Sequence, residues 1–201
     1  ILTTHVGSLP RSKELSEFLF AKDKGEKFSQ SSFDEVLKNN VASVVKKQLD
    51  VGIDFVSDGE MSKISYGTYI KDRIDGFSGE SERRAPADLD DFPEYKEKID
   101  KSGGTPTYTR PCCTNELKVK DENSLLQDIN NFKNSLDKLN HRHAFMNSAS
   151  PGVINVFMPN KFYSTEDEYL DKLSNIMAKE YEVITKSDIH VQLDCPDLAL
   201  A

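Results

Sequence analysis

Four polar residues each lie just past the end of a strand-like segment of the chain: Ser8, Glu60, Ser148 and Asp194. Barrel enzymes build their active sites at the carboxyl ends of parallel strands, with residues from several strands. The Gly7-Ser8 turn adds a place where the backbone can approach a ligand closely, because glycine has no side chain. This pattern predicts a binding site at the strand ends. Glu60 as a solvated loop residue and Asp194 as a turn former remain plain alternatives.

Histidine and cysteine residues raise the question of a metal site. His141 and His143 are two residues apart, so a strand would place both on one face, yet no third ligand lies nearby and a plain loop is the favoured interpretation. Cys112 and Cys113 are neighbours, whose side chains point to opposite faces of a strand. His5 is interpreted as a core histidine bonded to the backbone. We expect no metal ligand set in this chain.

Strand-like runs alternate with helical stretches. The runs cover 2–6, 53–57, part of 108–119, 144–147 and 189–193. Helices are expected over 12–21, from the capping-box sequence at 32–35 to Gly52, over 66–74 and over 121–139. Apolar residues at helical spacing support the second and the last of these. A second capping box at 165–168 opens a helix that continues through Ile184. The polar stretch 76–107 contains a further expected helix over 93–101.

This alternation predicts a parallel sheet. No G-x-G-x-x-G follows the first run, so a dinucleotide-binding fold has no support, and the polar strand ends favour a barrel. Five strands cannot close an eight-stranded barrel of about 250 residues. We therefore expect one partial barrel domain over 1–201, cut from a longer protein, with 76–107 as a long insertion or loop. Its open edge predicts self-association.

Composition and charge argue against several classes of function. The formal net charge is -8, whereas nucleic-acid binding depends on clustered Lys and Arg. No apolar run approaches the roughly 20 residues of a membrane helix, and no leader precedes the first run. The cysteines Cys112, Cys113 and Cys195 are odd in number and form no CxxC. We expect a cytoplasmic protein without a nucleic-acid or membrane partner.

Four segments resemble the strand-end motifs of one enzyme family. Thr3-Thr4-His5-Val6-Gly7-Ser8-Leu9-Pro10 is similar to the T-T-x-[IV]-G-S-[FL]-P opening of the catalytic domain of cobalamin-independent methionine synthase. The segment 54–60 resembles its second-strand motif, which ends in Gly-Glu; 191–196 resembles its fifth-strand Q-[IL]-D-E-P, and 145–151 resembles M-L-T-G-P more loosely. Each motif alone is weak, but four in the right order are strong. The relatives indicated are short, single-domain forms.

The resemblance implies a (β/α)8 TIM barrel enzyme that transfers a methyl group to the thiol of homocysteine and makes methionine. It assigns the backbone of Val6, Gly7 and Ser8 to clamping the amino acid, and Glu60 and Asp194 to binding it. The chemistry agrees, because an ammonium group attracts carboxylates and a carboxylate accepts from backbone N–H groups.

The family uses zinc, which lowers the pKa of a coordinated thiol enough to deprotonate it. Its ligands lie beyond the fifth-strand motif, so the resemblance places zinc in the complete protein, past Ala201, and implies that this chain alone is inactive. The resemblance assigns Ser148, Ser150 and Phe157 to the part of the site that would bind the methyl donor. Phe157 stands where the family has a folate-stacking Trp, and Leu200 where it has a folate-contacting Glu. The donor is therefore a folate or another methyl compound.

Two other readings stay open. A related zinc alkyltransferase would activate the thiol of coenzyme M, but its sulfonate does not suit the carboxylates of Glu60 and Asp194. A fragment without zinc ligands could instead bind an amino acid without catalysis. A barrel decarboxylase of the porphyrin type ranks low, because it would need a basic rim and the net charge is -8.

Overall fold

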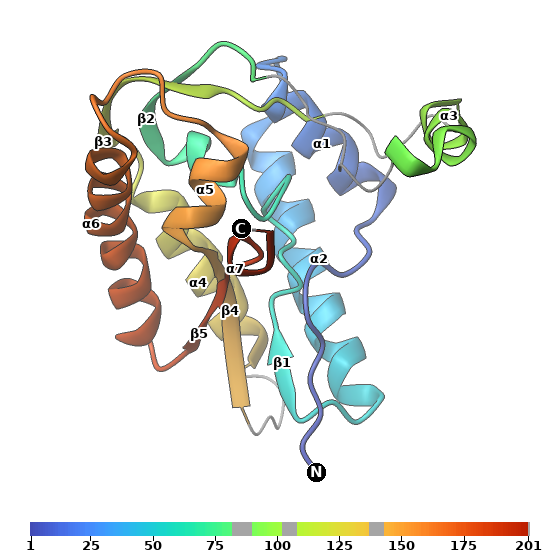
Figure 1. The fold of residues 1–201 in the computed structure, drawn as a ribbon. Coiled ribbons are helices and arrows are strands. Elements are labelled where there is room, and N and C mark those ends of the chain that lie inside the picture. The colour runs from blue at the N-terminus through green and yellow to red at the C-terminus, as the bar shows by residue number, and fades with distance from the viewer. Residues whose placement is uncertain (82–89, 102–107, 137–142, 201) are drawn as a thin grey trace.

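A parallel sheet built from distant segments lies at the centre of the molecule. The computed structural model describes residues 1–81, 90–101, 108–136 and 143–200. The strands β1 (Phe55–Ser57), β4 (His143–Ala149) and β5 (His190–Asp194) lie in the order β1-β4-β5, with both pairs parallel (Figure 1). Thr4 adds an isolated parallel bridge to Phe55, on the first expected run. Four parallel segments therefore stand side by side in chain order.

A separate antiparallel ribbon takes the place of the expected third parallel strand. β3 (Cys112–Val119) pairs with β2 (Ile74–Ser78) and not with the central sheet. The prediction that this chain supplies five parallel strand–helix units is therefore wrong, and the sheet has four parallel segments. The physical reason is burial. Only Cys112, Cys113 and Leu117 of β3 are buried, whereas a parallel strand covered by helices is buried on both faces.

The first two helices lie where the sequence predicts them. They are α1 (Lys13–Asp23) and α2 (Gln30–Asp50). The capping box at 32–35 was placed too late, because the N-cap of α2 is Ser29, whose hydroxyl accepts from the Ser32 N–H. Gly52 follows the helix with a φ of +85°, as expected of a residue that ends a helix.

The remaining helices are α3 (Pro93–Lys101), α4 (Asn123–Leu136), α5 (Pro151–Phe157), α6 (Glu166–Thr185) and α7 (Asp197–Leu200). Among them, α3, α4 and α6 lie where the sequence predicts them, whereas α5 and α7 were not predicted. The N-cap of α6 is Thr165, as the second capping box predicts. The helix expected over 66–74 is wrong: that segment forms the short 3-10 helix η1 (Tyr69–Asp72) and then enters β2.

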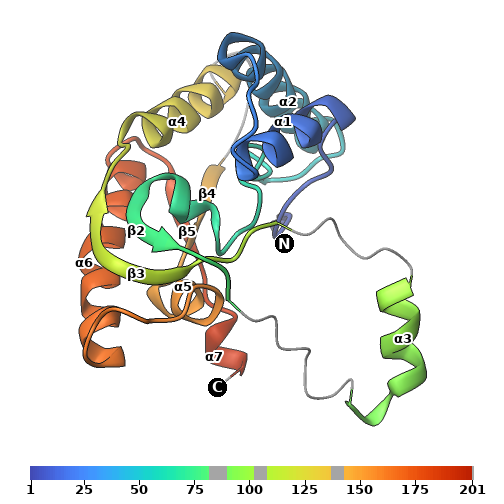
Figure 2. The same cartoon turned by 90° about the horizontal axis from the view of Figure 1, so that it is seen from above.

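Two hydrophobic clusters hold the helices against the sheet. The first joins α1, α2 and α4 to the face of the sheet that carries Val56, Ala144 and Met146. The second lies between η1, the β2–β3 ribbon, α5 and α6. Seen from above, α2, α4 and α6 stand around the outside of the sheet, and α3 lies apart from it (Figure 2).

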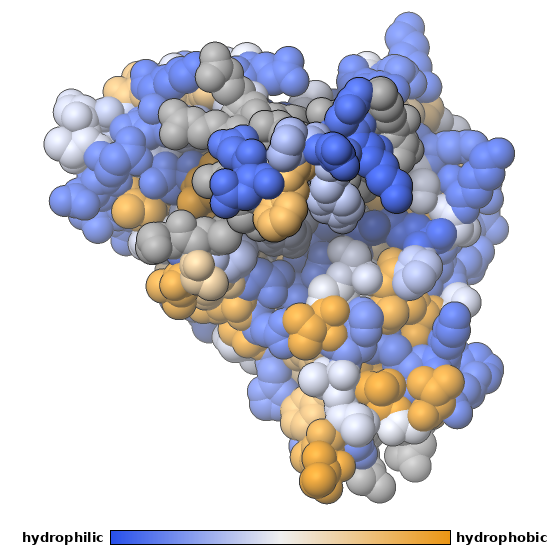
Figure 3. Space-filling model, turned by 45° about the vertical axis from the view of Figure 1, so that its right-hand side comes forward, coloured by the Kyte–Doolittle hydropathy of each residue, from blue (hydrophilic) through white to orange (hydrophobic). Residues whose placement is uncertain are grey.

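Apolar side chains also reach the surface. Figure 3 shows them gathered in the lower part of one face, and Figure 1 places the N-terminus at that end. Ile1, Leu2, Val6 and Val51 are among the large apolar side chains that are more than half exposed. Within the described ranges, no helix combines the length and the apolar character needed to cross a membrane.

Candidate functional site at the strand ends

The turn after β1 holds Glu60 in an uncommon backbone conformation. Its φ is +55°, in the left-handed region that residues other than glycine seldom adopt. The turn is fixed from several sides: Asp58 Oδ1 accepts from the Glu60 N–H at 3.0 Å, and Arg11 donates to the carbonyls of Glu60 and Lys63 at 2.7 and 2.6 Å. Strain of this kind persists where the surroundings enforce it, and it often marks functional sites.

The side chain of Glu60 has one satisfied oxygen and one free oxygen. It is 1% exposed. Its Oε2 accepts a hydrogen bond of 2.8 Å from the hydroxyl of Ser8, whereas its Oε1 is buried and has no hydrogen-bond partner among the described residues. An unpaired buried carboxylate oxygen is costly, so such atoms usually have a donor. The arrangement is suited to a ligand that supplies one.

The N-terminal segment brings Ser8 to Glu60. The Leu9 N–H donates to the carbonyl of Gly59 at 3.1 Å, which ties this segment to the turn after β1. Gly7 has a φ of +81° and open space where a side chain would begin. Val6 is 67% exposed. The predicted backbone clamp therefore lies on an accessible stretch of chain beside Glu60.

Asp194 ends β5 and is held by the neighbouring strand. The amide nitrogen of Asn147 donates to its two carboxylate oxygens at 3.1 and 3.3 Å. The main-chain carbonyl of Asp194 accepts from the Ser150 N–H at 3.1 Å. Sequence reasoning did not single out Asn147, although its position just before Ser148 at the end of a predicted strand was a usable signal.

The pKa of Tyr66 responds to both candidate carboxylates. Burial raises the pKa of its phenol, and nearby Tyr108 raises it further. Arg110 lowers this pKa, and the negative charges of Asp194 and Glu60 raise it by smaller amounts. Both carboxylates therefore lie within electrostatic range of one half-buried side chain. The ring of Tyr66 meets that of Phe157 edge-on, with 5.5 Å between the centroids.

Phe157 is packed into this aromatic group. The guanidinium of Arg110 lies 4.6 Å from the centre of its ring and 5.4 Å from that of Tyr108. A side chain at Gly67 would begin 3.1 Å from the Phe157 ring, so the backbone passes close to it. The ring that the sequence assigned to the methyl-donor side thus has protein neighbours on more than one side.

The two serines assigned to the methyl-donor side also have protein partners. Ser148 is fully buried and donates to Glu180 Oε1 at 2.6 Å. Ser150 caps α5 by accepting from the Val153 N–H, and it donates to Asp197 at 2.8 Å. Both hydroxyls hold the ends of β4 and α5 in place, and their role toward a methyl donor stays a prediction.

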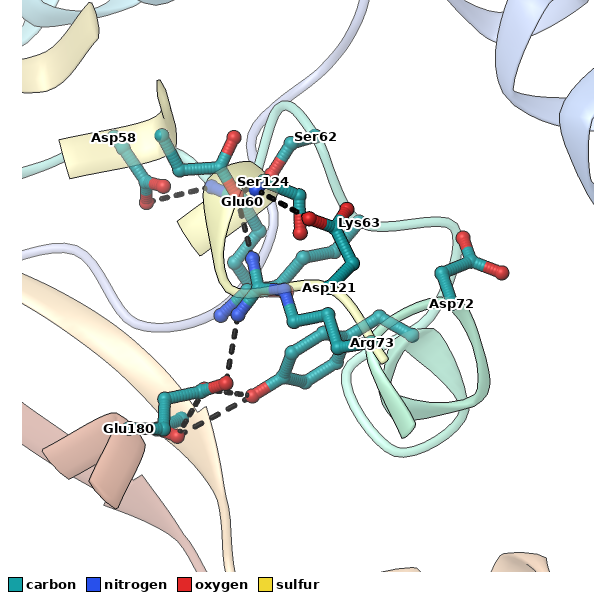
Figure 4. A network of polar contacts seen from close by, with 12 residues as sticks. Asp58, Glu60, Ser62, Lys63, Asp72, Arg73, Asp121, Ser124 and Glu180 are labelled. Atoms are coloured by element: carbon teal, nitrogen blue, oxygen red, sulfur yellow. Dashed lines mark hydrogen bonds and ion pairs between the residues drawn. The ribbon is translucent and has the colours of Figure 1, made fainter. Parts of the chain in front are cut away.

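A buried network of charges lies behind the site (Figure 4). Arg73 donates to Glu180 at 2.7 Å and to Asp128 at 2.6 Å. Burial by itself lowers the pKa of Arg73, but the charges of Glu180 and Asp128 outweigh it and raise that pKa. The pKa of Asp128 is raised by burial in spite of Arg73, whereas that of Glu180 is lowered, because Arg73 and Lys63 outweigh the effect of burial.

The sequence held a signal for this network that went unused. Asp128 and Glu180 stand among the apolar residues of α4 and α6, on the buried faces of those helices. Charged groups in such positions are rare unless they are paired. Lys63 gave no comparable signal, because it lies in a segment without regular periodicity. Arg73 gave none either, because it lies in the segment 66–74, which was wrongly expected to be a helix.

The described residues do not fit a zinc ion. They contain no group of three or more His, Cys, Asp or Glu side chains placed to hold a metal. His143 stacks on Phe55 with 4.3 Å between the ring centres, and His141 lies outside the described residues. Burial raises the pKa of the Cys113 thiol to about 11, and this thiol donates to the carbonyl of Asn115 at 3.5 Å.

The fold and the strand-end site define an α/β protein with polar residues at the carboxyl ends of parallel strands. Comparison with known proteins indicates a family within this class. Residues 1–87 match the family model described as "Cobalamin-independent synthase, Catalytic domain". The methionine synthase of Sulfolobus acidocaldarius is 27% identical over 195 residues, which are 96% of this chain and 51% of that protein. A 5-methyltetrahydropteroyltriglutamate–homocysteine methyltransferase of Bifidobacterium longum is 32% identical over 75 residues, 37% of this chain and 10% of that protein.

Solved structures share the fold. A B12-independent methionine synthase from Shewanella sp. W3-18-1, solved in complex with selenomethionine, superposes with a TM-score of 0.69 at 15% identity, over 96% of this chain and 51% of that one. A putative vitamin-B12-independent methionine synthase from Listeria monocytogenes gives 0.64 at 15% identity, over 96% and 51%. The resemblance to the catalytic domain of cobalamin-independent methionine synthase is therefore confirmed. The chain spans about half the length of the Sulfolobus protein and of both solved chains.

Proposed function

We propose that this chain provides the amino-acid-binding part of a methyltransferase that transfers a methyl group to the thiol of homocysteine and forms methionine. The observation that carries the proposal is the buried Glu60 Oε1, which has no partner in the described structure. An ammonium group would give this oxygen its missing donor. The names of the curated relatives, methionine synthase and homocysteine methyltransferase, support the same substrate.

Each residue of the site has a role in this proposal. Ser8 holds one oxygen of Glu60 and leaves the other for the ammonium. Asp194 adds a second negative charge, and the two carboxylates suit a cation far better than the sulfonate of coenzyme M. The backbone of Val6, Gly7 and Ser8 receives the carboxylate of the amino acid. Ser148, Ser150 and Phe157 remain assigned to the side of the methyl donor.

The proposal also covers the wider protein. The four parallel segments form the first part of a (β/α)8 barrel. The zinc ligands lie outside these 201 residues, and this chain's own residues bind and orient the amino acid. When bound in the complete protein, zinc would supply the activation of the thiol. The cytoplasmic location and the nature of the methyl donor, a folate or another compound, stay predictions.

Calorimetry with Glu60→Gln tests the proposal. This change keeps the shape of the side chain and removes its charge. A hydrogen bond to a charged group contributes about 1.5–3 kcal/mol, so affinity for L-homocysteine should fall roughly 10- to 150-fold. Affinity for 4-mercaptobutanoate, which lacks the amino group, should change little.

Glu35→Gln serves as the matched control, because Glu35 is exposed on α2. It should leave both affinities as they are. If Glu60→Gln weakened both thiols equally, Glu60 would be a structural residue of the rim, and the assignment of the amino-acid site would be wrong.

A further inference from the structure

Asn147 lies between the candidate site and the buried charge network. It is 2% exposed and stands in β4, where its register partner in β5 is Gln192. Its amide nitrogen donates to both oxygens of Asp194. The nitrogen must face Asp194, because an ionised carboxylate only accepts hydrogen bonds. A donor shared by both oxygens restrains rotation of the carboxylate.

The main chain of Asn147 is held from the other side. Its carbonyl oxygen accepts a hydrogen bond from the ammonium of Lys63. Lys63 is 3% exposed, and its ammonium lies 4.4 Å from the centre of the Tyr69 ring. Tyr69 in turn donates to Glu180 at 2.5 Å. The main chain of Asn147 is therefore held by a buried ammonium group, which itself packs against the ring of Tyr69.

The two candidate carboxylates differ in the contacts that hold them. Glu60 is held by Ser8, a half-exposed contact from the N-terminal segment. Asp194 is held by Asn147, which is buried and anchored through Lys63. A carboxylate that is already restrained loses less conformational freedom when it meets an ammonium group, and preorganisation of this kind increases affinity.

We infer that Asn147 is a positioning residue, which sets the direction of the Asp194 carboxylate toward the ammonium group of the amino acid, with Lys63 as its anchor. The inference rests on the proposed function, because it takes the ligand to be an amino acid. Asn147 touches Asp194 and acts through it. Replacing Asn147 should therefore lower the affinity only for ligands that carry the amino group.

A double-mutant cycle in the full chain tests this inference. Asn147→Ala removes the side-chain donor but keeps the carbonyl that Lys63 contacts. Calorimetry with L-methionine should show a loss of affinity of about 3- to 10-fold, less than the loss of a direct contact to a charged group, because Asn147 acts on the ligand only through Asp194. Binding of 4-(methylthio)butanoate, which lacks the amino group, should be unchanged. In an Asp194→Asn background, Asn147→Ala should weaken L-methionine by less than about twofold, because residues that act as a unit are not additive.

Asn147→Asp provides a second variant of the same size. It cannot donate and places a carboxylate against Asp194, so it should weaken L-methionine more than Asn147→Ala does. Equal losses for both ligands, or full additivity with Asp194→Asn, would overturn the positioning role and leave Asn147 as a structural residue.

A readout without ligand separates this inference from the proposed function. The side-chain amide signals of Asn147 in ¹H–¹⁵N NMR should move when Asp194 becomes Asn. If the wild type binds L-methionine and 4-(methylthio)butanoate equally, the proposed function fails, and the inferred role in amino-group recognition fails with it. If the wild type prefers L-methionine but the amide signals stay in place, only the positioning role is overturned.

Discussion

At the scale of single residues, two carboxyl groups of one turn have different surroundings. Asp58 and Glu60 are both buried after β1. Burial raises the pKa of Asp58, and the attraction of Lys63 and the hydrogen bond from the Glu60 N–H only partly offset it. Asp58 therefore stabilises the turn by accepting from the Glu60 N–H, but burial destabilises its charged form. Glu60 differs because one of its carboxylate oxygens is left without a partner among the described residues.

The raised pKa of Asp58 should make the free energy of unfolding depend on pH. A carboxyl group with a raised pKa binds its proton more tightly in the folded state, so its contribution to stability falls as the pH rises above its ordinary value of 3.8. Asp58→Asn removes this titration and can still accept from the Glu60 N–H. Urea unfolding at about pH 4.5 and about pH 7 should show the variant gaining relative to the wild type at the higher pH.

The opposite sign is expected for Glu180, whose pKa is lowered, so that its stabilisation is lost as the pH falls below 4.5. An Asp58→Asn variant with the same difference from the wild type at both pH values would contradict the interpretation of Asp58.

Sequence reasoning found the residues that stand at strand ends and missed those behind them. Glu60 and Asp194 were identifiable because each follows a predicted strand within a family-like motif. Lys63, Arg73 and Asn147 depend on contacts between distant segments, such as the bond from Lys63 to the carbonyl of Asn147. No local periodicity carries that information.

At the scale of elements, the β2–β3 ribbon depends on Gly76. Its φ is +110°, and the register of the ribbon shifts at this residue. A side chain there would begin 2.8 Å from Leu117 Cδ2 and 2.9 Å from the carbonyl oxygen of Asn115. The bulge therefore needs glycine both for its backbone conformation and for space.

Gly76→Ala should be more destabilising than the same change at a glycine that has a positive φ but no close neighbours. Gly25 is the matched control, with a φ of +69° and open space around it. A left-handed conformation costs roughly 1–2 kcal/mol for other residues, so Gly25→Ala should lose about that much. Gly76→Ala should lose about 1–3 kcal/mol more, the usual cost of overpacking. Equal losses in urea unfolding would show that the close contacts at Gly76 relax freely.

Elements with strong local signals were predictable, and the ribbon was not. Thr165 begins α6 through its hydroxyl contact with the Glu168 N–H, a bond that neighbouring residues make by themselves. The segment that leads into β2 reads like a helix in the sequence, since Ile70 and Ile74 are four residues apart. The pairing of β2 with β3 is a long-range event that overrides this local pattern.

At the scale of the whole molecule, the parallel sheet has a free edge. Among the described strands, β5 pairs only with β4, and Leu193 of β5 is 44% exposed. Unpaired strand edges are prone to pair with other chains.

We expect the isolated chain to self-associate through β5. Sedimentation velocity over a range of concentrations should give a mass above the 22.7 kDa of one chain. Leu193→Lys should weaken the association, because charge on an edge strand opposes pairing. The exposed change Val51→Lys, outside the sheet, is the control and should leave it intact. A single species of 22.7 kDa at every concentration would contradict this expectation.

The insertion of the ribbon between β1 and β4 also affects how the chain reaches its native state. Phe55 pairs with His143, so two neighbouring strands of the sheet must find each other across a long intervening segment. The entropy of closing such a loop grows only with the logarithm of its length, so the ribbon adds little to the equilibrium cost. Folding rates respond more strongly, because they fall as contacts become more distant in sequence. The β2–β3 pairing joins segments that are nearer in the sequence, and we expect the β1–β4 pairing to be a later and slower step of folding.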